Sequence, residues 1–157
     1  TENKGVCELL DAFTHWQEAH PGIDLVLAGI NREGRPFTER VERVPQVHYL
    51  SHIPHAQALA LMQASEMVLL PSRSEGLPLT IVEAVALGKK VLCPPNIPEF
   101  DAHLSDFVLP EVTIDAILAT LTTIWQNPAQ PSYPLENHRV EAVVAKLLRV
   151  YEKLLRP

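Results

Sequence analysis

The chain has 157 residues, of which 46% are apolar and 20% charged, a balance that suits one globular domain and excludes a disordered segment. Its net charge of −6 argues against a nucleic-acid binder, which would need a basic face. Two widely separated cysteines, Cys7 and Cys93, disfavour a disulfide framework or a zinc site and predict a cytoplasmic, reducing location.

Helical and strand-like segments alternate along the chain. In chain order, we expect helix 5–19, strand 24–30, a short helix within 31–45, strand 46–50, helix 55–64, strand 67–70, helix 78–87, strand 90–93, a weak strand 107–109, and helices 113–126 and 137–155. Such alternation predicts βαβ units and therefore a three-layer, Rossmann-like α/β domain over residues 1–157, with a parallel sheet of five or six strands.

The segment 71–88 carries the chemistry, because it follows a predicted strand at the end where parallel sheets bind ligands. Pro78 suits the first turn of a helix, where its missing N–H costs nothing. Backbone amides would then point out of the helix start at Gly76, Leu77, Leu79 and Thr80. Free amides and the helix dipole favour an anion such as a phosphate.

Two carboxylates flank this predicted helix start. From Leu77 to Gly88 only Thr80 and Glu83 are polar, so Glu83 lies on a helix that is apolar almost all round and expected to be buried. A buried carboxylate needs a partner, and sugar hydroxyls are suitable donors. The structural alternative is that Glu75 caps the helix and Glu83 meets an internal Arg, Lys or backbone amide. Spacing alone favours this alternative.

Other polar residues give weaker signals. His48, His52 and His55 come nearest to a metal cluster, but Pro54 breaks their spacing, so no metal site is predicted. Arg73 in the loop after strand 67–70 would reach a phosphate or, equally, be a surface arginine.

An ordered series of motifs resembles one enzyme family. Glu75 and Glu83 form an E-x7-E pattern within P-S-x-x-E-G-x-P-L-x-x-x-E-A-x-A-x-G-K-x-V, and Lys4-Gly5 opens a K-G-x-x-x-L-x-x-A-F pattern. Segments 25–29, 48–51, 59–71 and 98–99 follow in register. The series is similar to the donor-site signature of retaining glycosyltransferase family 4, group 1, which has the GT-B fold, and covers about residues 4–126.

The resemblance implies a role for each matched residue. Glu75 would bind hydroxyls of the donor sugar, Glu83 the ribose hydroxyls, and Lys4 the diphosphate as the nucleotide leaves. The sugar and phosphates would also be held through Gly76, Leu77, Leu79 and Thr80, and the base bordered by Leu50, Ser51 and Ile53. The nucleotide sugar is a substrate, and no metal or other cofactor is required.

The same resemblance implies that the chain is the C-terminal, donor-binding half of a two-domain enzyme. The family has a strand carrying an Arg before its Lys-Gly, and an N-terminal acceptor-binding domain, which this chain does not include. The family's G-x-G and turn glycine are replaced by Gly29-Ile30-Asn31 and Ser51. We therefore expect this piece alone to bind a donor weakly and transfer nothing. A non-catalytic nucleotide-sugar module and a sugar-nucleotide epimerase on the same scaffold remain alternatives.

The terminal helix 137–155 is amphipathic. Its apolar stripe is expected to pack on the domain's own core, in preference to packing on the absent N-terminal domain. Its opposite face carries Lys146, Arg149, Lys153 and Arg156, which would suit peripheral association of the whole enzyme with a membrane, although Glu141 and Glu152 weaken that signal.

Overall fold

The computed structural model describes residues 2–32 and 34–155. In chain order its elements are η1 (Glu2–Lys4), α1 (Val6–Ala19), β1 (Leu25–Ala28), α2 (Arg35–Glu42), β2 (Val47–Leu50), α3 (His55–Ala64), β3 (Met67–Leu69), α4 (Leu79–Ala86), β4 (Lys90–Leu92), α5 (Pro98–His103), η2 (Ser105–Phe107), α6 (Ile114–Gln126), η3 (Leu135–His138) and α7 (Val140–Leu154). The expected alternation of strands and helices is confirmed, and α5 is an addition that the sequence pattern did not predict.

The strands pair in parallel, as expected, but not in one sheet. β1 pairs with β2 from Leu25↔Val47 to Ala28↔Leu50, and β3 pairs with β4 from Met67↔Lys90 to Leu69↔Leu92. Among the described residues, no ladder joins β1 to β3. The prediction of a continuous five- or six-stranded sheet is therefore wrong, because a cavity of about 560 Å³, lined by both strands, separates their facing edges.

The weak strand expected at 107–109 is reduced to a single bridge. Cys93 and Val108 pair in parallel, with the Cys93 N–H donating to the Phe107 carbonyl at 2.7 Å and the Leu109 N–H to the Cys93 carbonyl at 3.0 Å. Residues 105–107 instead form the η2 turn, which replaces the first part of the strand.

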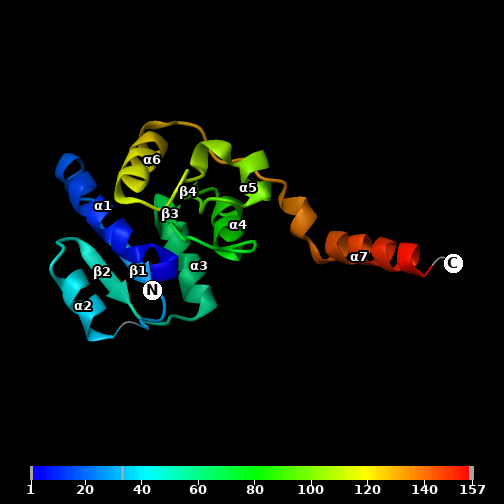
Figure 1. Ribbon diagram of the computed structural model, residues 1–157, viewed down its shortest axis with the longest axis horizontal. Helices are drawn as coiled ribbons and strands as arrows, with labels where there is room; N and C mark the ends of the chain where they lie inside the picture. Colours follow the sequence, from blue (N-terminus) through cyan, green and yellow to red (C-terminus); the bar gives the residue numbers. More distant parts are fainter. Residues whose placement is uncertain (1, 33, 156–157) are drawn as a thin grey trace.

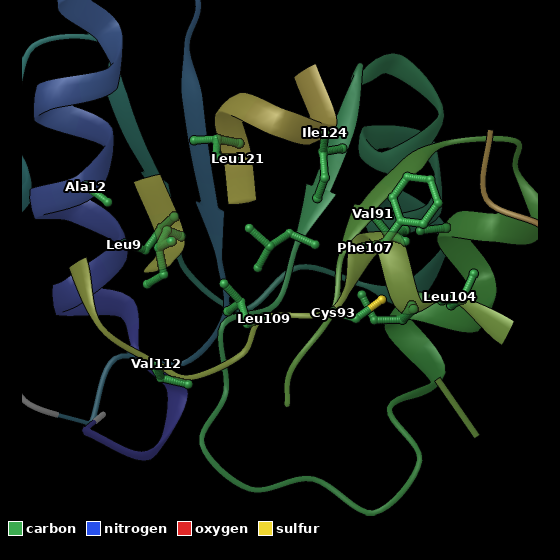
Figure 2. Close-up of a cluster of buried hydrophobic side chains, with 14 of the residues drawn as sticks. Leu9, Ala12, Val91, Cys93, Leu104, Phe107, Leu109, Val112, Leu121 and Ile124 are labelled. Carbon is green, nitrogen blue, oxygen red and sulfur yellow. The ribbon is translucent and has the colours of Figure 1, made fainter. Parts of the chain in front are cut away.

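The core lies between the β3–β4 pair and the helices α1 and α6. Figure 2 shows side chains from these elements and from the loop that follows η2 pointing toward one another: Leu9, Ala12, Val91, Cys93, Leu109, Leu121 and Ile124. Burial raises the pKa of the Cys93 thiol to about 12, so this thiol is a packing group. The Lys90 ammonium donates to the carbonyls of Ile124, Trp125 and Asn127 at 3.0, 3.3 and 2.6 Å, and so caps the end of α6.

The terminal helix α7 does not pack on this core, contrary to expectation. It projects away from the body (Figure 1), and none of its side chains is buried. Its only extensive contact among the described elements is with the adjacent η3 turn. The extended segment after α6 and the η3 turn lead the chain away before α7 begins, so the apolar stripe faces outward. In the described part of the chain, no helix is long and apolar enough to cross a membrane.

Gly5 brings the start of α1 into close contact with the loop after β3. Its φ of +60° is left-handed, and a Cβ built on it would lie 2.1 Å from the Pro71 carbonyl oxygen and 2.7 Å from Val112 Cγ1. The Arg73 N–H donates to the Asn3 carbonyl at 2.8 Å beside this contact. A side chain at position 5 would therefore push apart two segments that lie about 70 residues apart in sequence.

We predict that Gly5→Ala destabilises the fold by about 3 kcal/mol, from left-handed strain and steric overlap together. Gly88→Ala is the matched control, because Gly88 has φ +70° with nothing within 4 Å of a built Cβ, and it should cost only about 1 kcal/mol. Urea unfolding of both variants measures the difference. Equal losses would show that the close approach at Gly5 contributes nothing.

Candidate functional site

The predicted site residues come from three segments: the η1–α1 junction, the loop from β3 to α4, and the start of α3 after β2. The first two are joined through Asn3, Gly5 and Arg73 as described above. The third reaches the site because α3 packs on α4. Since β2 and β3 run parallel to their partners, these loops follow the carboxyl ends of strands, where such sheets hold ligands.

Lys4 and Glu75 form an ion pair between the first two segments. Lys4 Nζ donates to Glu75 Oε1 at 2.5 Å, and the side chains are 48% and 17% exposed. Burial alone would raise the pKa of Glu75, but the hydrogen bond and charge of Lys4, with the nearby Ser72 hydroxyl, outweigh it and hold that pKa below its ordinary value. Ser72 is wholly buried. Its hydroxyl lies near Glu75, but no partner among the described residues has the distance and angle of a hydrogen bond to it.

The α4 start presents free backbone donors beside this pair. Pro78 precedes the helix with φ −73° and ψ 110°, one position earlier than the first-turn place expected for it. Along residues 76–81, the backbone N–H of Ile81 is the first that has an acceptor within the described chain, and it donates to the Pro78 carbonyl. The amides without an acceptor there are those predicted: Gly76, Leu77, Leu79 and Thr80. Leu79 is 62% exposed, so this helix start is open to solvent.

Glu83 lies on the same helix, and its partner is a histidine. His55 Nε2 lies 2.9 Å from Glu83 Oε1, and the Glu83 side chain is 29% exposed. Neither the internal Arg or Lys nor the backbone amide considered from the sequence is this partner. Glu83 is half-buried rather than enclosed, because the buried face of α4 is formed by Ile81, Val82, Ala84 and Val85.

Sequence reasoning missed His55 as a neighbour of Glu83. It is the first residue of α3, directly after Pro54, whereas the histidine spacing was considered only for metal binding. His48 instead pairs with Asp24 at 3.3 Å, away from His55. In the residues that the structure describes, no three His, Cys, Asp or Glu side chains gather in a way that could hold a metal ion.

Arg73 ties segments together. Its guanidinium donates to the Val112 carbonyl at 2.9 Å and to the Glu8 carboxylate, while its backbone N–H binds Asn3. These contacts join the loop after β3 to α1 and to the segment before α6. The Arg73 guanidinium forms an ion pair with Glu8, so this ion pair would have to break before the guanidinium could bind a phosphate.

Leu50, the last residue of β2, and Ser51 lie at the surface, and Ile53 is half-buried, with α3 beginning two residues later. Ser51 is not among the described residues with positive φ, so the loss of the family's glycine costs no backbone strain. In the neighbouring loop, the Tyr49 hydroxyl donates to the Gly29 carbonyl at 2.8 Å and accepts from the Asn31 N–H at 2.9 Å. This bridge fixes the segment that stands where the family has G-x-G.

The arrangement combines two carboxylates, the half-exposed ammonium of Lys4 and a set of backbone amides without acceptors among the described residues. Amides at a helix start bind anionic oxygens, whereas half-buried carboxylates accept hydrogen bonds from hydroxyl groups. Of the carboxylates predicted from the sequence, Glu75 pairs with the predicted Lys4, and Glu83 pairs with His55, which was not predicted as its neighbour.

Comparison with known proteins agrees with these motifs. Residues 1–141 match the family described as Glycosyl transferases group 1. The chain belongs to this family. Curated relatives include a glycogen synthase of Mycobacterium tuberculosis, 27% identical over 88 residues, 54% of this chain and 21% of the relative. An uncharacterized glycosyltransferase of Haemophilus influenzae is 24% identical over 130 residues, 80% of this chain and 37% of the relative.

Solved structures show the same fold. AviGT4, a glycosyltransferase involved in avilamycin A biosynthesis, aligns with a TM-score of 0.67 and 22% identity over 99% of this chain and 49% of its own. The pneumococcal O-GlcNAc transferase GtfA, solved with UDP and GlcNAc, aligns with a TM-score of 0.62 and 18% identity over 98% of this chain and 30% of its own. This group 1 glycosyltransferase chain therefore has the α/β fold found in GT-B enzymes, and it spans between about a fifth and a half of these relatives.

The Lys4–Glu75 pair predicts a pH dependence of stability. The folded pKa of Glu75 lies below its ordinary 4.5, so ionised Glu75 stabilises the fold above that pH, and the contribution is lost as pH falls through the lowered value. The cost of Glu75→Gln, measured by urea unfolding, should be largest at neutral pH, about 1 kcal/mol or less because Lys4 is half exposed, and should shrink as the pH falls below 4.5. Glu141→Gln on the projecting α7 should match the parent throughout. A cost of Glu75→Gln that is independent of pH would contradict the pair's role.

Proposed function

We propose that this chain is the donor-binding part of a retaining glycosyltransferase, which transfers a sugar from a nucleotide-diphosphate sugar to an acceptor held elsewhere in the whole protein. The observation that carries the proposal is the meeting of Lys4 and Glu75 beside the open start of α4, with Glu83 on the next turns of the same helix. Family membership and the motif positions support the reaction class.

In this proposal each part of the donor has matching groups. The diphosphate lies against the amides of the α4 start and Lys4, the donor sugar hydroxyls bind Glu75, and the ribose hydroxyls bind Glu83. UDP and GlcNAc in the complex of the related GtfA support a nucleotide sugar as the donor class. Lys4 stabilises the charge that builds on the diphosphate as the sugar–phosphate bond breaks, so the residues supply the electrostatic help that a metal would otherwise give.

The Lys4–Glu75 and His55–Glu83 pairs must rearrange when a donor binds. Lys4 is held by Glu75 at 2.5 Å and Glu83 by His55 at 2.9 Å, so a donor has to compete with both of these contacts. Lys4 is half exposed and on a flexible stem, which allows its charge to be shared between Glu75 and a phosphate. His55 is 69% exposed, so a ribose can displace it into solvent at little cost.

Binding measurements by ligand-observed NMR test these assignments with UDP, GDP and ADP, with their sugar conjugates and with the bare nucleosides. Glu83→Gln should weaken every nucleotide by about 10- to 100-fold, because hydroxyl bonds to a charged acceptor are lost. Glu75→Gln should weaken only the sugar conjugates. Lys4→Met should weaken diphosphates more than the bare nucleosides, since it removes only a phosphate contact.

Glu136→Gln in η3 is the control and should bind like the parent. Parent-like binding by both Glu75→Gln and Glu83→Gln would overturn the site. If the site holds, product analysis with the whole protein separates the transferase from a binding module, which forms no glycoside, and from an epimerase, which converts the nucleotide sugar without an acceptor.

A further inference from the structure

The carboxylate of Glu83 has a histidine as its partner in the ligand-free chain. His55 Nε2 lies 2.9 Å from Glu83 Oε1, and in the described part of the chain no other side chain forms a hydrogen bond or ion pair with this carboxylate. A protonated imidazole is a charge-assisted donor to a carboxylate, whereas a neutral imidazole is a weaker one. The strength of the contact that covers Glu83 therefore depends on whether the ring carries a proton.

No second charged group lies on the two helices that hold this pair. α3 begins at His55 and is otherwise uncharged, and Glu83 is the one charged residue of α4, the helix on which α3 packs. In the adjoining segments, His52 precedes α3, Glu66 follows it and Lys89 follows α4. Among the described residues, none of these three forms a hydrogen bond or ion pair with either member of the pair. The pair is therefore governed by its own two groups.

The start of α3 disfavours a positive charge on His55. His55 is the first residue of this ten-residue helix, directly after Pro54. The N-terminus of a helix carries the positive end of the helix dipole, so a cation there is stabilised only if a nearby anion outweighs the dipole. The Glu83 carboxylate is that anion. If a ligand takes Glu83 away, a protonated ring is left at the positive end of a helix, and its proton is lost to water more readily.

The exposure of the two side chains allows such an exchange of partners. The Glu83 side chain is 29% exposed, and the His55 side chain in contact with it is 69% exposed. The ring thus covers part of a carboxylate that solvent still reaches, and little of the protein packs on the ring to hold it there. His55 can therefore turn into solvent when another donor approaches Glu83.

We infer that His55 is an internal competitor of the donor, which occupies Glu83 when the ring is protonated and yields it to the ribose hydroxyls when the ring is neutral. The inference rests on the proposed function, because it takes Glu83 as the ribose contact. When the donor binds, ribose hydroxyls donate to the carboxylate, and the imidazolium releases its proton to solvent as it turns away. Donor affinity therefore rises with pH across the range in which histidines change charge.

Isothermal titration calorimetry of the whole protein with UDP-, GDP- and ADP-glucose, from about pH 5.5 to about pH 8, tests the inference. Sugar conjugates are used because their phosphates lack the second ionisation of a phosphate monoester. Glu75 stays ionised over this range, since its pKa lies below 4.5. The parent's affinity should rise about two- to five-fold, as an exposed ion pair allows. Near about pH 6, buffers of different ionisation enthalpy should reveal release of part of a proton per donor bound.

Two glutamine variants separate His55 from the other histidines. His55→Gln keeps an amide donor toward Glu83 but cannot titrate, so its affinity should be independent of pH and its binding should release no proton. His48→Gln is the matched control, because His48 pairs with Asp24 at 3.3 Å and is 58% exposed, and it should keep the pH dependence of the parent. Both positions are exposed, so neither substitution disturbs the core.

The possible failures can be told apart. A parent affinity that is the same at both ends of the pH range, or a dependence that persists in His55→Gln, would overturn the inference and leave the proposed donor site intact. The same holds for a dependence that disappears in His48→Gln, which would assign the titration to the wrong pair. Absence of binding of every conjugate by both the parent and His55→Gln would overturn the proposed function together with the inference.

Discussion

The contact between the N-terminal turn and the loop after β3 is the constraint on which the site depends. Gly5 lies against the Pro71 carbonyl, the Asn3 carbonyl accepts from the Arg73 N–H, and the Arg73 guanidinium binds Glu8 and Val112. Of these groups only Arg73 was a candidate phosphate contact, and its guanidinium binds Val112 and Glu8. Together these contacts hold Lys4 opposite Glu75, and they do so through backbone approach and a structural arginine, which leaves Lys4 and the α4 amides available for chemistry.

The net charge of −6 makes the local arrangement of charges around Lys4 and Glu75 important. An acidic domain has no broad basic face, so under the proposed function a diphosphate would be attracted only at short range, by one ammonium and by oriented backbone amides. Pairing Lys4 with Glu75 avoids leaving a half-buried carboxylate without a partner.

Local patterns predicted the elements well, and contacts between distant segments were the part they could not predict. Apolar periodicity and the Gly and Pro positions predicted the four paired strands and most of the helices, and the motif around Glu75 and Glu83 predicted a candidate site at the start of α4. The separation of the β1–β2 pair from the β3–β4 pair was missed. The residues of an apolar segment indicate that it forms a buried strand, but they do not indicate which other strand pairs with it. His55 beside Glu83 and Arg73 on Glu8 were missed for the same reason, since each joins residues far apart in sequence. The apolar stripe of α7 was correctly recognised, but its assignment to this core was wrong.

The exposed stripe of α7 has a consequence for the helix itself. Its large apolar side chains from Val140 to Leu154 are all at least 42% exposed, so tertiary packing contributes almost nothing to its stability. A 15-residue helix without such packing is marginal in water, because nucleation is costly and each added residue contributes little. The fraction of helix in these residues therefore depends on how much of the apolar stripe of α7 is buried, and it can serve as a measure of that burial.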